Sequence, residues 1–377
     1  MSQILEEHRH YVADQVRIAK YAAAIAHGVK PGDVVIDLGA GTGILGVMAL
    51  RAGARRVYAI DASPALELAR AVAAANGVAD RVVFVRERST RARLPEMADV
   101  VVGDQLGAFG YGAGVLEYFA DARLRLLKPG GRVIPSRVTF VVAPVASEAC
   151  RARVSWWSRS VEGVSLEPIA DIAAASSHAV ALRSADLVAA PARGGSVACD
   201  ENPTLLRIAA SATAERDAAI DGIGAWFDAD MGGGITMTNG PLDPQRIDRE
   251  QLLYPMAQPV DVRSGDRVDI AITIRPGDAV ARWSVAVTDP SGATRASATH
   301  SSFAGMLVGP RDLARANPSS HPVLSDWGRA RQAVLELCDG TRSLQAIEAA
   351  VASRYAALFP DADSVSRFVA ESLDAVV

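Results

Sequence analysis

The sequence predicts an α/β protein with three parts: a doubly wound, Rossmann-like parallel sheet, a β-barrel or sandwich with a helical arm, and a small winged-helix-like α unit. Three observations support this prediction. Short apolar segments alternate with helical patterns over residues 1–137, strands separated by turn residues dominate 138–308, and three helical patterns follow within 309–377. Alternating strands and helices are typical of parallel sheets, whereas closely spaced short strands are typical of barrels and sandwiches.

The pattern of residues 1–137 predicts the helices and strands of the parallel sheet. Apolar residues at helical spacing predict a helix over 12–27, which ends at Gly28 and Pro31. Short β-branched segments then predict buried parallel strands. The expected strands are 33–38, 56–60, 81–85, 98–102 and 132–134, and the expected helices between them are 44–52, 64–76 and 115–127.

The middle and last parts follow a different pattern. The strands expected in the β unit are 138–145, 204–212, 224–229, 235–238, 268–274 and 283–288. Residues 152–192 read as mostly helical and interrupt this unit. Residues 311–322 contain Pro318 and Pro322 and read as a linker. Helical patterns at 329–338, 344–355 and 364–376 complete the chain.

Composition limits the function classes. The 377 residues carry a formal net charge of −4 and no sustained basic run, so nucleic acid is not the expected partner. The widely spaced Cys150, Cys199 and Cys338 predict neither a disulfide framework nor a metal site. The N-terminal residues show no apolar signal-peptide core, and no apolar stretch approaches the roughly 20 residues of a membrane span. We therefore expect no membrane partner and a cytoplasmic location.

The strongest chemical signal is the segment Asp37-Leu-Gly-Ala-Gly-Thr-Gly43, placed between a predicted strand and a predicted helix. Glycines there let a ligand approach the backbone, and the helix N-terminus offers free N–H groups. A dinucleotide fingerprint would have its third glycine where Ile44 stands. The D-x-G-x-G-x-G pattern is instead the usual motif for S-adenosylmethionine (SAM), which favours a class I methyltransferase sheet.

Two acidic residues follow predicted strands of this sheet, Asp61 the second and Asp104 the fourth. Asp61 lies 22 residues after Gly39, where a carboxylate can accept hydrogen bonds from both ribose hydroxyls. A role as a helix cap before Pro64 is the structural alternative for Asp61. Asp104 is the first polar side chain after Val102, and we expect it to face the transferable group, although a solvated loop acid would look the same.

Residues 11–145 resemble the catalytic domain of protein arginine methyltransferases, and the likeness extends over about 10–300. The segment Asp14-Gln-Val-Arg17-Ile-Ala-Lys-Tyr21 matches that family's helix over the cofactor. The resemblance implies that Arg17 holds the methionine carboxylate of SAM, whose product is S-adenosyl-L-homocysteine. Trp156 and Trp157 fall in the arm through which that family dimerises, which implies a homodimer. The expected cofactor-binding set is Tyr11, Arg17, Asp37, Gly39, Gly41, Thr42, Gly43, Ile44, Leu45, Asp61, Ala62, Ser89, Thr90 and Asp104.

The chain departs from this family where the acceptor is bound. Two glutamates hold the target guanidinium in the family; Asp104 and Ala113 stand at their places. The family's T-H-W motif reads 247–249 here, Ile-Asp-Arg, and Ser89-Thr90 replaces a glutamate that contacts adenine. Because a guanidinium is recognised by paired carboxylates, arginine is not the expected substrate. Asp104 and Asp248 are the candidate catalytic residues that would orient or deprotonate another acceptor.

The last segment resembles a second family. Leu335-Glu-Leu-Cys-Asp-Gly340 and the helical patterns around it resemble PqqD-like domains, which bind leader segments of ribosomally made peptides by strand addition. A small structural appendage is the alternative. We therefore expect a methyltransferase acting on a ribosomally synthesised peptide or protein at nitrogen or oxygen. A small-molecule methyltransferase of a biosynthetic pathway and a non-catalytic SAM-binding scaffold remain open.

Overall fold

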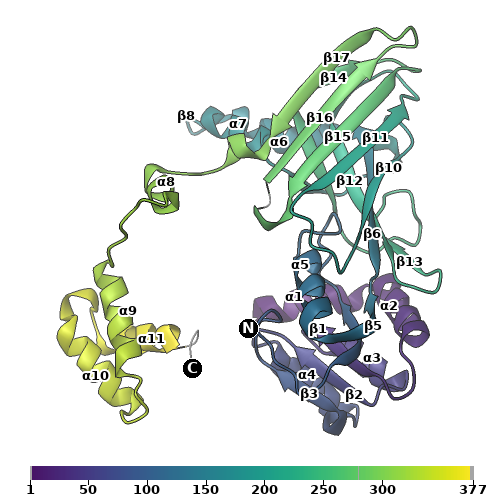
Figure 1. Cartoon of the computed structure of the whole chain (residues 1–377). Helices are drawn as coiled ribbons and strands as arrows, with labels where there is room; N and C mark the ends of the chain where they lie inside the picture. Colours follow the sequence, from purple (N-terminus) through teal and green to yellow (C-terminus); the bar gives the residue numbers. More distant parts are fainter. Residues whose placement is uncertain (1, 279, 374–377) are drawn as a thin grey trace. The chain divides into compact units, whose positions relative to one another are not determined.

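The computed structural model describes residues 2–278 and 280–373 (Figure 1). The chain divides into two compact units, Met1–Met306 and Leu307–Val377, which are described separately below. The division falls close to residue 309, where the sequence changes its pattern.

The first unit begins with the expected parallel sheet of five strands in the order β3-β2-β1-β4-β5. The central strand β1 is buried along its whole length because helices cover both faces of a parallel sheet. The strand order reverses between β1 and β4, and ligands bind at such reversals in open α/β sheets. The elements of this part are α1 (Ser2–Ala13), α2 (Gln15–Gly28), β1 (Val34–Leu38), α3 (Ile44–Arg51), β2 (Arg56–Ile60), α4 (Leu66–Ala75), β3 (Val82–Val85), β4 (Ala98–Gly103), α5 (Val115–Arg125) and β5 (Leu127–Ile134).

Two antiparallel sheets follow, as the sequence predicts. One has the order β10-β6-β12-β14-β9, with β13 beside β12, and the other has the order β11-β15-β16-β17. The indole Nε1 of the fully buried Trp283 donates to the Pro255 carbonyl over 2.7 Å and links the two sheets. The strands are β6 (Arg137–Val145), β9 (His178–Val180), β10 (Ala192–Ala198), β11 (Leu206–Thr213), β12 (Ala218–Asp230), β13 (Thr236–Thr238), β14 (Gln251–Val262), β15 (Arg267–Arg275), β16 (Val280–Thr288) and β17 (Thr294–Ser301).

The arm is less helical than expected. Within 152–192 the long helices are confined to the end of α6 (Glu148–Ser155) and to α7 (Glu167–Ala174). Between them lies a hairpin of β7 (Ser160–Val161) and β8 (Val164–Ser165). The turn has positive φ at Glu162 and Gly163, and β-branched valines flank it. This local turn chemistry explains why a continuous helix does not form.

The parallel sheet and the antiparallel sheets meet at the loop after β4. Asn239 connects the two parts, because its amide Nδ2 donates to the Ala108 carbonyl over 2.8 Å and to the Glu250 carbonyl over 2.9 Å. Phe109 packs edge-on against Phe140 of β6. The acceptor side of the predicted site is therefore built jointly by both parts of the first unit.

The second unit is a small helical cluster. Its helices are α8 (Pro310–Ala316), α9 (Asp326–Leu337), α10 (Leu344–Arg354) and α11 (Ala362–Leu373), and Val334, Val351 and Val369 form the centre of its core. Ser325 and Ser343 cap α9 and α10. The three predicted helices are present, and the expected linker contains the short α8. Between residues 307 and 373 the structure has no strand, so the wing of a winged-helix unit is missing there.

Among the helices within residues 2–278 and 280–373, none is long and apolar enough to span a bilayer.

Candidate functional site

The glycine-rich loop lies at the carboxyl end of β1, at the reversal of strand order. Gly39, Gly41 and Gly43 all have positive φ, between 52° and 71°, which favours glycine. A Cβ on Gly41 would lie 2.5 Å from the ring of His8, and a Cβ on Gly43 would lie 2.9 Å from the Cβ of Ala69. The loop is therefore packed from both sides: Gly41 faces α1, while Gly43 packs against α4.

Asp37 supports this loop from beneath and does not line a cavity. Its carboxylate is 1% exposed and accepts the Gly46 N–H, in the first turn of α3, over 2.8 Å. Burial raises the pKa of Asp37 to about 7, opposed by the Gly46 hydrogen bond. The expectation that Asp37 contacts the cofactor stays a prediction: the side chain is buried and is bonded to the start of α3.

Asp61 holds the loop from the neighbouring strand. One carboxylate oxygen accepts the Gly41 N–H over 2.9 Å, and the other accepts the Ser63 N–H over 2.8 Å. The N-cap of the following helix α4 is Ala65, so Asp61 is not a helix cap. Its half-buried carboxylate remains at the edge of both cavities described below.

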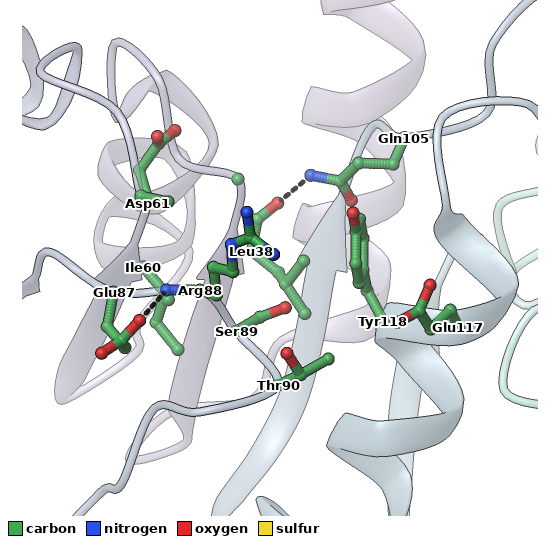
Figure 2. A pocket seen from close by; sticks show the side chains of 12 residues that line it. Leu38, Ile60, Asp61, Glu87, Arg88, Ser89, Thr90, Gln105, Glu117 and Tyr118 are labelled. Carbon is green, nitrogen blue, oxygen red and sulfur yellow. Dashed lines mark hydrogen bonds between the residues drawn. The ribbon is translucent and has the colours of Figure 1, made fainter. Parts of the chain in front are cut away.

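A cavity of about 440 Å³ opens over the carboxyl ends of β1 and β2 (Figure 2). Ser89 and Thr90 lie on one side of it and Tyr118 of α5 on another, as Figure 2 shows. Volumes of this size accept a drug-sized ligand. Its lining residues are Leu38, Gly39, Ile60, Asp61, Ala62, Glu87, Arg88, Ser89, Thr90, Gln105, Glu117 and Tyr118.

A second cavity of about 410 Å³ lies beneath α1 and α2. It shares Gly39, Asp61 and Gln105 with the first cavity, so the two meet at the glycine-rich loop. Its lining residues are Ile4, Glu7, His8, Tyr11, Val12, Arg17, Ile18, Tyr21, Gly39, Ala40, Gly41, Thr42, Ile44, Leu45, Asp61, Ser63, Asp104, Gln105 and Ala113.

Gln105 lies where the two cavities meet, a role that the sequence did not predict. Its Nε2 donates to the Leu38 carbonyl over 2.7 Å, and its Oε1 is buried without a hydrogen-bond partner (Figure 2). A Cβ on Gly39 would collide with this side chain, so glycine is required for the close approach. The position directly after Asp104 was the available signal, because it also follows the end of β4.

Arg17 enters the second cavity from α2. Asp14 caps this helix by accepting the Arg17 N–H over 3.0 Å, which fixes where Arg17 lies. The guanidinium donates to the Tyr11 carbonyl over 2.7 Å and stacks 4.7 Å from the centre of the Tyr11 ring. It also forms an ion pair with Asp104.

Asp104 is shared by two arginines. Its Oδ2 pairs with Arg17 and, over 3.2 Å, with Nη2 of Arg249 from the loop before β14. The three side chains are 6%, 11% and 14% exposed, for Asp104, Arg17 and Arg249 in turn. Burial lowers the pKa of Arg249, but the Asp104 carboxylate together with Tyr21 and Tyr11 raises it, and the net shift is upward. The cluster therefore carries one more positive charge than negative.

Asp248 lies in the loop before β14, next to Arg249. Its backbone N–H donates to Oδ2 of Asp14 over 2.7 Å, its side chain is exposed, and it lines neither cavity. The next residue, Arg249, supplies the side chain that reaches Asp104. A catalytic role for Asp248 therefore stays a prediction: its carboxylate is exposed, and its amide is bonded to Asp14 at the start of α2.

The cavities bring together most of the predicted cofactor set. Every member lines one cavity or the other, except Asp37 and Gly43, which support the loop. His8, Glu7 and Tyr21 also line the second cavity and were not in that set. His8 packs over Gly41, and the only sequence signal for it was its position on the helix expected over the cofactor. Among residues 2–278 and 280–373, no cluster of His, Cys, Asp or Glu is suited to a metal.

The chain is similar in sequence to known methyltransferases. The profile of the ribosomal protein L11 methyltransferase family matches residues 21–140. A probable protein arginine N-methyltransferase 6.1 of Oryza sativa subsp. indica is 37% identical over 169 residues, which are 44% of this chain and 44% of that protein. Protein arginine N-methyltransferase 6 of Xenopus laevis is 29% identical over 286 residues, 72% of this chain and 84% of that protein. The chain thus spans under half the length of the rice relative.

Solved structures share the fold. A Trypanosoma brucei PRMT1 enzyme–prozyme heterotetrameric complex with AdoHcy superposes with a TM-score of 0.68 at 19% identity, covering 78% of this chain and 97% of that one. Arabidopsis thaliana protein arginine methyltransferase 10 gives a TM-score of 0.67 at 21% identity, covering 79% and 97%. The expected fold, a Rossmann-like sheet followed by antiparallel sheets, is confirmed. The comparisons do not test the PqqD-like resemblance of the second unit.

The buried Asp37 predicts a pH-dependent stability. The pKa of Asp37 is about 7 in the folded protein and 3.8 in the unfolded chain. Its contribution to the free energy of unfolding is therefore complete below pH 4 and declines as the pH rises to about 7. The free energy of unfolding of Asp37→Asn, relative to that of the wild type, should therefore rise by about 2–3 kcal/mol on going from pH 5 to pH 8. Urea unfolding at the two pH values measures this. The exposed Asp80→Asn serves as control and should follow the wild type; an unchanged Asp37→Asn difference would contradict the assignment.

Proposed function

We propose that this chain, a protein-arginine-methyltransferase-like SAM-dependent methyltransferase, transfers a methyl group to a nitrogen or oxygen of a peptide or protein acceptor other than arginine. The observation that carries the proposal is the pair of cavities meeting at Gly39, Asp61 and Gln105. One has room for a nucleoside, and the other reaches Arg17 and Asp104. A cofactor spanning both would present its methyl group on the acceptor side.

The chain's residues suit SAM in three places. The Asp61 carboxylate is positioned at the junction to accept ribose hydroxyls, and Ser89 and Thr90 line the nucleoside side. Arg17 supplies a guanidinium for the methionine carboxylate. SAM itself supplies the electrophilic methyl group, so the protein has to position the acceptor in line and exclude water.

The acceptor side argues against a guanidinium substrate. Asp104 is the one acidic side chain left of the expected pair, because Ala113 lines the cavity at the second place. A guanidinium is bound in a defined orientation by bidentate or paired carboxylates. One shortened carboxylate does not supply that, although the relatives named above are arginine methyltransferases.

A peptide acceptor is supported by the second unit. In the turn after α9, which carries the PqqD-like sequence pattern, Thr341 donates through its N–H and hydroxyl to Asp339, and Gly340 has a φ of 79°. Because residues 307–373 contain no strand, a leader would bind to helix surfaces and not by strand addition. A small-molecule acceptor is the alternative, with the second unit structural. A non-catalytic SAM-binding scaffold is a further alternative, and measuring SAM turnover separates it from both.

SAM binding tests the cofactor half of the proposal. Asp61→Ala removes the predicted ribose hydrogen bonds and should weaken SAM binding by on the order of 1.5–3 kcal/mol, about tenfold or more. Calorimetric titration of SAM into wild type and variant measures the loss. Asp80→Ala is the matched control, because Asp80 is an exposed acid in the 3-10 turn before β3 and lines neither cavity. Equal affinities for all three proteins, or none for the wild type, would refute the assignment.

The acceptor half is tested with an arginine-rich peptide. Incubating the wild-type chain with SAM and an Arg-Gly-Gly repeat peptide should give no methylarginine by mass spectrometry, because the paired carboxylates are missing. The assay is informative once SAM binding has been measured with the same preparation. Methylarginine at multiple-turnover levels would overturn the exclusion of arginine and return the chain to its relatives' substrate.

We also propose a homodimer formed through the arm. Trp156, Val161 and Val164 expose apolar surface there, with Val164 64% exposed. Light scattering should then give about twice the 39.5 kDa of one chain. Val164→Glu should shift the mass towards the monomer, whereas Leu124→Glu should not, although Leu124 of α5 is 82% exposed. A monomeric wild type would disprove the proposal.

A further inference from the structure

Arg249 occupies the carboxylate that a substrate guanidinium would need. Its Nη2 donates to Asp104 over 3.2 Å, and its Nη1 donates to the Gly107 carbonyl over 3.3 Å. The guanidinium also lies 6.0 Å from the centre of the Tyr11 ring. Carboxylate, carbonyl and aromatic face are the partners a bound guanidinium uses.

Arg249 is held in this position by its own backbone. Gln251 Nε2 donates to the Arg249 carbonyl over 3.2 Å, and the carbonyl of the next residue, Glu250, accepts from Asn239 over 2.9 Å. On the other side, the Asp248 N–H is fixed to Asp14. With the backbone bonded on both sides and the side chain 14% exposed, Arg249 is a built part of the site and not a surface residue that happens to reach inward.

We infer that Arg249 is the specificity-determining residue of this site: it places the chain's own guanidinium on Asp104 and so excludes guanidinium acceptors. This inference deepens the proposed function and rests on it. A third cation would compete with Arg17 and Arg249 for the Asp104 carboxylate, in surroundings where unbalanced charge is costly. Removing the Arg249 side chain should therefore open a subsite with the size, charge and hydrogen-bond acceptors for a free guanidinium.

Ethylguanidine is the probe for this subsite. In Arg249→Ala it should bind at least tenfold more tightly than in wild type, because a charge-assisted hydrogen bond to Asp104 becomes available. Calorimetric titration measures the affinity directly, without methyl transfer. Ethylammonium at the same concentration tests shape, since it has the charge but not the planar fork. Ethylguanidine should bind the variant better than ethylammonium does.

Two further variants keep the experiment decisive. Arg246→Ala removes an arginine from the same loop that is exposed and lines neither cavity, so it should behave like wild type. Arg249→Gln keeps a hydrogen-bonding side chain without charge, and replaces Arg249→Ala if that variant fails to fold. Gain of ethylguanidine binding in the Arg249 variants alone supports the inference. Equal binding by wild type, Arg246→Ala and the Arg249 variants overturns it.

Methyl transfer then separates this inference from the proposed function. With isotope-labelled SAM, label on ethylguanidine in Arg249→Ala but not in wild type supports both. The transfer forms an N–CH₃ bond, breaks the S–CH₃ bond of SAM, leaves its electron pair on sulfur as S-adenosylhomocysteine, and releases the nitrogen's proton to water. Binding of ethylguanidine without SAM binding would leave Arg249 as the specificity residue and refute the proposed methyltransferase function.

Discussion

The carboxylate of Asp14 is the interaction on which the geometry of the acceptor side depends. One oxygen caps α2 through the Arg17 N–H, and the other accepts the Asp248 N–H from the loop before β14. A single side chain thus sets the position of the helix that supplies Arg17 and of the loop that supplies Arg249. Since these arginines come from the two parts of the first unit, their meeting at Asp104 requires those parts to be held in register, which Asn239 reinforces through Ala108 and Glu250.

The cofactor side depends on a different pair of acids. Asp37 lies below the glycine-rich loop and accepts the Gly46 N–H of α3. Asp61 lies beside the loop and accepts the N–H of Gly41, which has positive φ. Asp37 is buried at the cost of a raised pKa, whereas Asp61 stays half-buried and available at the junction of the cavities. Asp37 therefore supports the loop from the core, whereas Asp61 both supports the loop and lines the two cavities.

Much of this was predictable from the sequence, and the failures have physical causes. Strand β1, its loop and Asp61 follow from local pattern: an apolar segment, glycines and a strand-end acid. The strands β10, β14 and β17 were missed, because Gly194 and Gly195, Pro255 and Pro259, and a run of small polar residues respectively hide the alternation. The outward turn of Asp248 and the inward turn of Arg249 depend on an amide donated to Asp14, 234 positions away, which no local pattern records.

Two departures from the arginine methyltransferase pattern both make the acceptor cavity more positively charged. Ala113 removes a negative charge from the acceptor cavity, and Arg249 adds a positive one beside Asp104. A decaying site would lose groups without replacement, whereas Asp104 has gained a second cationic partner at its Oδ2, while its Oδ1 is buried without a hydrogen-bond partner. Here the added guanidinium is paired with Asp104, bonded to the Gly107 carbonyl and supported from behind by Gln251. One carboxylate is lost and one guanidinium, held by several hydrogen bonds, is gained. This replacement favours a changed acceptor over a site that has lost its function.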